Sequence, residues 1–362
     1  MSVDLKEEVI NVALGDIPMF PPASVREFGA VSLLKNWKGY QAPQGIEGLK
    51  KTISKWLQPS LDIQISPEQI LITVGSTMGL MLSYRLIGKS GIAIPNPGFP
   101  LYKKSISNLG IRISSYEVGK GNSWEDTLKS IEESLQQGIK CVVWNNPNNP
   151  LGIIAPAKVV KEFCDLVEKY DAWCITDEVY KDFAYNEEIV SPYNYIPDRT
   201  LYIYSFSKSF LLSGLRIGFI LGPISQMKEL TELQWGTSMS VPWISQDITK
   251  FFLENYPLFP SEVSQEVSQR LNKGCEELLR ESIPFYRPAG GIYICIDTSS
   301  LHITSREFRD LCFEQENVLI MPCEEFGSQG KYLSRINVGV SDAVFFKAVK
   351  KIIKCYKVVQ RS

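Results

Sequence analysis

Histidine is almost absent from this sequence, since His302 is the only one in 362 residues. A single histidine argues against the common metal clusters and against any triad whose histidine base lies elsewhere in the chain. The eight cysteines form no Cys-x-x-Cys pair, which is typical of reduced thiols in the cytoplasm. We therefore expect no metal site and a proton carrier other than histidine.

The sequence also lacks an excess of positive charge and a long apolar run. Its formal net charge is −2, from 38 Lys and Arg against 40 Asp and Glu, so it offers no basic surface to a nucleic acid or an anionic membrane. No segment contains eighteen consecutive apolar residues, and residues 1–8 are polar and charged, unlike a signal peptide. These features predict a cytoplasmic protein without nucleic acid or membrane partners.

What the sequence does contain is a regular alternation of two patterns. Short runs rich in β-branched and aromatic residues alternate with helical stretches such as 77–87, 124–137 and 157–170. This alternation predicts a mainly parallel sheet covered by helices on both faces, an α/β domain. The predicted strands are 70–74, 91–95, 111–116, 141–145, 172–176, 200–205 and 217–221.

The last third of the chain has a different pattern. Residues 245–282 are predicted to be helical, with a break at 256–260. A strand at 290–297, a helix at 305–316 and a final helix at 343–356 follow, with further short strands between them. This order predicts a second, smaller α+β unit.

Polar residues directly follow several predicted strands. Open α/β sheets bind ligands beyond the carboxyl ends of their strands, so these residues are candidates for a site. The turn Gly75-Ser76-Thr77 begins a helix whose free amides could hold a phosphate, although it could also be an ordinary helix cap. Residues 146–152 could form only a turn, and Asp177 could only cap a helix.

The fourth site carries a lysine. Residues 205–218 read Ser-Phe-Ser-Lys-Ser-Phe-Leu-Leu-Ser-Gly-Leu-Arg-Ile-Gly, with Lys208 among hydroxyl groups and Arg216 further on. A lone lysine is usually a solvated surface charge, but this whole segment resembles the lysine-attachment signature of class I and II aminotransferases. The other three sites fall in the family's order and spacing, so the resemblance covers nearly the whole chain.

The resemblance implies a fold-type-I transferase that depends on pyridoxal 5′-phosphate. The expected large cofactor-binding domain is 36–262, with a mainly parallel seven-stranded sheet, and 1–35 with 263–362 would form the small domain. The expected reaction moves an amino group from an L-amino acid to a 2-oxo acid. Lys208 would form the aldimine with the cofactor and move the α-proton through a quinonoid.

The shared motifs leave the outcome of the reaction open. A decarboxylase, a lyase or cyclase, or an oxidase of the same fold is the alternative enzyme. A binding protein that has lost activity is a further alternative, which the presence of Lys208, Asp177 and Arg335 disfavours.

The resemblance also assigns the residues around the cofactor. Asp177 would pair with the pyridine nitrogen, Tyr180 and Asn149 would hydrogen-bond the phenolic oxygen, and Phe99 would stack on the ring. Lys208, Asp177 and Tyr180 are the expected catalytic residues. The phosphate would be held by Gly75, Ser76, Thr77, Ser205, Ser207 and Arg216.

Three further assignments concern the substrate and a partner subunit. Arg335 matches the arginine that binds the substrate α-carboxylate, a task that suits its planar fork of donors. Gly15 and Asn149 are expected beside the same carboxylate. Tyr40 matches a tyrosine that reaches the cofactor phosphate of the neighbouring subunit, which implies a homodimer with shared active sites.

The sequence departs from the family pattern at several positions. Leu151 replaces a threonine, and Tyr102 stands where some relatives have a histidine beside the pyridinium aspartate. Residues 234–243 offer no second basic residue for the distal carboxylate of a dicarboxylic substrate. The sequence therefore predicts a substrate with a neutral or aromatic side chain, or a cationic one if Glu324 reaches the pocket.

Overall fold

The computed structural model describes residues 9–119, 123–185 and 188–361. Residues 1–8, which the domain and localisation predictions include, lie outside the described residues. Within the described ranges, none of the helices combines the length and hydropathy needed to cross a lipid bilayer.

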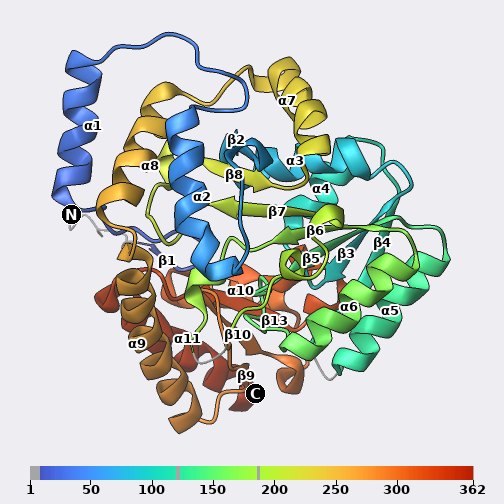
Figure 1. Cartoon of the computed structure of the whole chain (residues 1–362). Coiled ribbons are helices and arrows are strands. Elements are labelled where there is room, and N and C mark those ends of the chain that lie inside the picture. Colours follow the sequence, from blue (N-terminus) through green and yellow to red (C-terminus); the bar gives the residue numbers. More distant parts are fainter. Residues whose placement is uncertain (1–8, 120–122, 186–187, 362) are drawn as a thin grey trace.

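A seven-stranded sheet forms the centre of the large domain, in the order β2-β8-β7-β6-β5-β3-β4 (Figure 1). Only β8 runs antiparallel to its neighbours, β2 and β7. All seven predicted strands are confirmed to within two residues at each end. The strands are β2 (Ile70–Thr73), β3 (Ile92–Asn96), β4 (Ile113–Glu117), β5 (Cys141–Asn145), β6 (Trp173–Asp177), β7 (Thr200–Ser205) and β8 (Gly218–Leu221).

Helices cover both faces of this sheet, as expected from strands that are mostly apolar on both sides. The helices α3 (Gly75–Ile87), α4 (Pro100–Asn108) and α7 (Ile224–Ser238) pack on one face. The opposite face is covered by α2 (Glu47–Leu61), α5 (Trp124–Gln136), α6 (Ala157–Lys169) and α8 (Trp243–Asn255). The predicted helices at 77–87, 124–137 and 157–170 correspond to α3, α5 and α6.

The smaller unit contains a four-stranded sheet in the order β12-β13-β10-β9. Its elements are β9 (Phe285–Tyr286), β10 (Tyr293–Asp297), β12 (Met321–Pro322) and β13 (Leu333–Asn337), with α9 (Phe259–Arg280), α10 (Ser305–Glu316) and α11 (Asp342–Arg361). The predicted helix at 305–316 is α10. The predicted strand at 290–297 begins later, at Tyr293, because Gly291 has a φ of +77° and turns the chain.

The N-terminal segment joins both units. Strand β1 (Ile10–Asn11) pairs in parallel with β11 (Val318–Leu319) of the small unit. Helix α1 (Ala23–Lys35) then lies alongside α8 at the edge of the large unit (Figure 1), where the rings of Phe28 and Phe251 stack. The division into 36–262 and 1–35 with 263–362 stays a proposal.

Candidate active site

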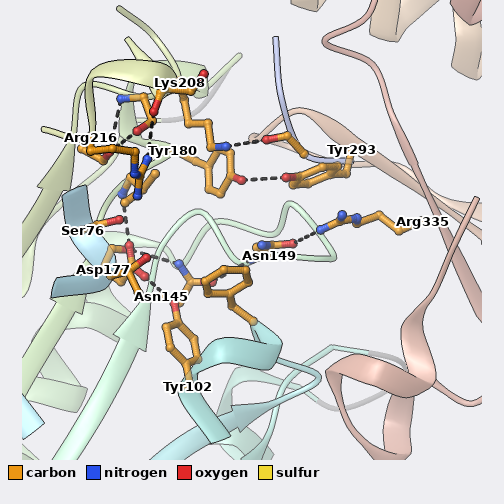
Figure 2. Close-up of a pocket in the computed structure, with 17 residues that line it drawn as sticks. Ser76, Tyr102, Asn145, Asn149, Asp177, Tyr180, Lys208, Arg216, Tyr293 and Arg335 are labelled. Carbon is orange, nitrogen blue, oxygen red and sulfur yellow. Dashed lines mark hydrogen bonds between the residues drawn. The ribbon is translucent and has the colours of Figure 1, made fainter. Parts of the chain in front are cut away.

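A cavity of about 290 Å³ lies at the carboxyl ends of the parallel strands (Figure 2). The β5, β6 and β7 ends and the start of α3 supply one wall, and the small unit and the N-terminal segment supply the other. The predicted residues that line it are Gly15, Ser76, Thr77, Phe99, Asn149, Asp177, Tyr180, Ser205, Ser207, Lys208, Arg216 and Arg335.

Two predicted residues do not line the cavity. Gly75 lies directly behind it, and a Cβ added there would come within 2.8 Å of the Arg216 guanidinium. Because its φ is also +68°, glycine is the residue that suits this position. Tyr40 is 85% exposed in the single chain.

One end of the cavity is built to hold an anion. Ser76 and Thr77 occupy the first turn of α3, where backbone amides have no partner within the helix and the dipole favours negative charge. The hydroxyl of Ser205 donates to that of Ser207 over 2.8 Å. Arg216 points into the same space and donates to the Ser213 carbonyl at 2.9 Å. A phosphate group fits this set of donors.

Asp177 ends β6 as a buried carboxylate. Burial raises the pKa of Asp177 to about 6, and two donors oppose that rise: the Tyr102 hydroxyl at 2.6 Å and the Val179 amide at 3.3 Å. The contact between Tyr102 and Asp177, suggested by the position of Tyr102 in the sequence, is therefore present (Figure 2). A positively charged ligand group beside Asp177 would stabilise its ionised form.

Arg335 lies at the opposite side as a buried cation, 4% exposed. Its guanidinium donates to the Asn149 side chain and to the Ala13 carbonyl, both at 2.9 Å, while its Nε has no hydrogen-bond partner among the described residues. The rings of Tyr293 and Phe326 lie 3.9 and 4.8 Å from the guanidinium carbon. Lys208, between these two ends, donates to the Gly15 carbonyl (Figure 2).

The described residues provide no charge partner for the ionisable groups of the cavity. Within the described parts of the chain, no ion pair joins Asp177, Lys208, Arg216 or Arg335 to another residue. Asp177 and Arg335 are buried, and a buried, unpaired charge is costly unless a ligand pairs with it. Pyridoxal phosphate with an amino acid supplies the complementary set, because it carries a phosphate, a ring nitrogen that can be protonated and a carboxylate. The residues present therefore fit this cofactor.

Sequence reasoning missed two residues that order this site. The Asn145 side chain donates to the Asp177 carbonyl at 3.0 Å and accepts from the Asn149 amide at 2.8 Å, so it links the end of β6 to the loop that follows β5. The Tyr293 hydroxyl lies 2.7 Å from that of Tyr180. Asn145 ends a predicted strand and could have been noticed, whereas Tyr293 lies within an apolar strand of the other unit.

Of the departures from the family pattern, Tyr102 lines the cavity, whereas Leu151 and Glu324 lie outside it. Leu151 is buried in a small cluster with Cys295, Cys323 and Phe326, so it affects packing. Glu324 lines a separate cavity and pairs with Arg306 at 2.8 Å. The condition for a cationic substrate, that Glu324 reaches the pocket, is not met.

Comparisons with known proteins agree with this geometry. The family model described as aminotransferase class I and II matches residues 7–352. An aspartate aminotransferase of Pyrococcus horikoshii is 24% identical, over 96% of this chain and 90% of its own length. The aromatic-amino-acid aminotransferase 2 of Thermococcus litoralis is 24% identical, over 97% and 92%.

A solved structure shows the same fold. The aromatic aminotransferase from Pyrococcus horikoshii superposes with a TM-score of 0.92 at 22% identity, over 98% of both chains. The fold-type-I prediction is confirmed. The named relatives support amino transfer and not the decarboxylase, lyase, cyclase or oxidase alternatives. With a family-model match over residues 7–352 and a pocket that fits the cofactor, this chain belongs to the class I and II aminotransferases, which depend on pyridoxal phosphate.

Proposed function

We propose that this enzyme transfers the amino group of an L-amino acid with a neutral or aromatic side chain to a 2-oxo acid. One observation carries the proposal: Asp177 and Arg335 are buried, oppositely charged and without an ionic partner in the described residues, and Lys208 lies in the same pocket. This arrangement supports a ligand with a cationic ring at one end and a carboxylate at the other.

Each group of pocket residues has its own role in the proposed reaction. Lys208 would hold the cofactor covalently, and its amine would take the proton from the substrate α-carbon. The cofactor supplies the electron sink for that step, and Asp177 keeps its ring nitrogen protonated. Arg335 fixes the α-carboxylate through bidentate hydrogen bonds, which orients the Cα–H bond toward Lys208. Ser76, Thr77, Ser205, Ser207 and Arg216 hold the phosphate.

The cations of the cavity argue against a dicarboxylic substrate. The described lining contains three cationic side chains, Lys208, Arg216 and Arg335, and each already has a role. The described lining offers no further cation for a distal carboxylate. Such a carboxylate would lose its hydration on binding without gaining an ionic partner. Phe99, Tyr102 and Tyr293 give the cavity an aromatic surface.

We expect this preference to appear in half-reaction rates. The loaded protein is mixed with single amino acids without any oxo acid, and the loss of visible cofactor absorption is followed. Phenylalanine, tyrosine or a neutral aliphatic amino acid should react at least about tenfold faster than aspartate, since an unpaired carboxylate costs more than about 1.4 kcal/mol. A clear preference for aspartate would refute the substrate class but leave amino transfer intact.

We also propose a homodimer in which Tyr40 completes the phosphate site of the partner subunit. Tyr40 is 85% exposed in the single chain. Three apolar side chains that precede it are similarly exposed: Leu34 at 85%, Trp37 at 81% and Phe20 at 80%. Large apolar side chains this exposed in one segment are typical of a surface that a partner covers. A second copy of the chain is the partner that the shared-site prediction requires.

Tyr40→Phe tests the shared site. Loss of a hydrogen bond to a charged phosphate should weaken cofactor binding about tenfold, measured as the dissociation constant of pyridoxal phosphate. The matched control is Tyr195→Phe, which removes the hydroxyl of a tyrosine that is 41% exposed and distant from Tyr40 in the sequence. A monomeric mass in solution, or equal affinities for wild type and Tyr40→Phe, would contradict this proposal.

A cytoplasmic location is likewise a proposal. All eight cysteines are buried and free, which suits a reducing compartment. Fractionation of cells that produce the protein would test it.

A further inference from the structure

Tyr293 contacts two other residues of the active site, Arg335 and Tyr180. It begins β10, is 3% exposed, and projects from the small unit into the pocket (Figure 2). Its ring lies under the Arg335 guanidinium, 3.9 Å from the guanidinium carbon. Its hydroxyl lies 2.7 Å from the hydroxyl of Tyr180, with the rings edge to face at 5.7 Å.

Gly15 makes room for this arrangement. A Cβ at Gly15 would collide with the Tyr293 hydroxyl. Tyr293 therefore occupies the space between the N-terminal segment, Arg335 and Tyr180, and its position depends on a glycine that was predicted to lie beside the substrate carboxylate.

One of the two possible donor arrangements of this hydroxyl pair suits a donor role for Tyr180. Burial and the neighbouring Tyr293 hold the pKa of Tyr180 well above its usual range, so Tyr180 is protonated at neutral pH. Around the Tyr293 hydroxyl, the described hydrogen-bond partner is Tyr180, and the neighbouring guanidinium of Arg335 can only donate. Either hydroxyl could be the donor in this pair, and the arrangement in which Tyr293 donates to the oxygen of Tyr180 leaves the proton of Tyr180 free to point into the pocket.

We propose that Tyr293 is a positioning residue with two effects: its hydroxyl orients Tyr180 as a donor toward the cofactor, and its ring holds Arg335 at the substrate carboxylate. This inference rests on the proposed function, in which Tyr180 donates to the phenolic oxygen of the cofactor. The charged groups around the pair are Arg335 on β13, Asp177 on β6 and Lys208 after β7.

Tyr293→Phe and Tyr293→Leu separate the two effects. Phenylalanine keeps the ring and removes the hydroxyl, so the donor bond of Tyr180 to the phenolic oxygen weakens and protonation of the bound cofactor becomes easier. We expect the midpoint of the pH titration of the visible absorption to move up by about 0.5 to 1 pH unit, as loss of one hydrogen bond predicts. The KM for the amino acid should change little.

Leucine removes both groups. Tyr293→Leu should show the same spectral shift and, in addition, bind an unreactive carboxylic acid such as 3-phenylpropanoate about tenfold more weakly, since the cation–π contact with Arg335 is lost. Calorimetry on the cofactor-loaded protein measures this affinity without any turnover.

Two further variants exclude a general loosening of the fold. In Tyr116→Phe, a buried tyrosine outside the pocket loses a hydroxyl that donates to the Val143 carbonyl at 2.7 Å. It should leave the spectral midpoint unchanged. In a Tyr180→Phe background, Tyr293→Phe should add no further shift, because the hydroxyl that it orients is gone.

The outcomes are distinct. A Tyr293→Phe protein that titrates like wild type, or a shift of equal size in Tyr116→Phe, would overturn the inference. A wild-type protein that shows no visible absorption after addition of pyridoxal phosphate would instead overturn the proposed function. The combined pattern of a spectral shift in both Tyr293 variants and weaker carboxylate binding only in Tyr293→Leu supports both effects.

Discussion

Lys208→Ala is expected to lower turnover by at least about a thousandfold, because the same side chain attaches the cofactor and carries the α-proton. Lys208 lies in the pocket without an ionic partner, and its amine donates only to the Gly15 carbonyl among the described residues. Alanine removes that amine and leaves the anion site of Ser76, Thr77 and Arg216 in place. Cofactor binding should therefore persist without covalent attachment.

The two roles can be measured separately. Borohydride reduction followed by peptide mass analysis should find the cofactor on Lys208 in the wild type and on no lysine in Lys208→Ala. Lys208→Arg is the matched variant, since it keeps the charge but cannot form the covalent link. Lys181→Ala removes a lysine that contacts the rings of Trp56 and Tyr204 outside the pocket, and it should react normally. Normal turnover of Lys208→Ala would refute the assignment.

The sheet of this protein could be predicted well because its signals are local. Most of its strands are buried, mainly apolar runs of four to six residues, such as β7 with all of Thr200–Ser205 buried. Segments with a helical pattern separate many of these strands. The predicted strand ends were less accurate where a glycine with a positive φ turns the chain, as at Gly291 before β10. The small sheet pairs segments that are far apart in the sequence, such as β10 with β13, and no local pattern specifies this pairing.

The site residues that belong to family motifs could be predicted from the sequence. Asn145 and Tyr293 were missed because their roles depend on contacts across the fold: Asn145 links the end of β6 to the loop that follows β5, and Tyr293 comes from the other unit. The position of Glu324 was likewise undecided in the sequence. Its pairing with Arg306, on α10, keeps it away from the pocket.

Asp177→Asn is expected to change activity and stability in opposite directions. In the loaded enzyme, the variant loses the charge that keeps the ring nitrogen protonated, so the rate of α-proton removal should fall roughly a hundredfold or more. The Tyr102 hydroxyl, 2.6 Å from Asp177 in the wild type, can still donate to the asparagine oxygen. The loss therefore reflects charge and not the shape of the site.

The sign of the stability change follows from the raised pKa of Asp177. Its carboxyl titrates near pH 6 when folded and near 3.8 when unfolded, so stability of the cofactor-free protein is lost as the pH rises from about 4 to about 6. Asparagine does not titrate, and the cofactor-free variant should gain on the order of 2 kcal/mol relative to wild type at pH 7. Urea unfolding of both proteins at pH 4 and pH 7 measures this difference.

Glu178→Gln separates a buried carboxylate from a catalytic one. Burial raises the pKa of Glu178 to about 7, yet this neighbour accepts hydrogen bonds from Thr176 and Ser191 and does not line the cavity. Its amide variant should also flatten the pH dependence of stability but leave the rate nearly unchanged. Only Asp177→Asn should combine a more stable cofactor-free protein with a slow enzyme, because the charge of Asp177 costs stability until the cation of the cofactor pairs with it. An unchanged rate in Asp177→Asn would remove Asp177 from the mechanism.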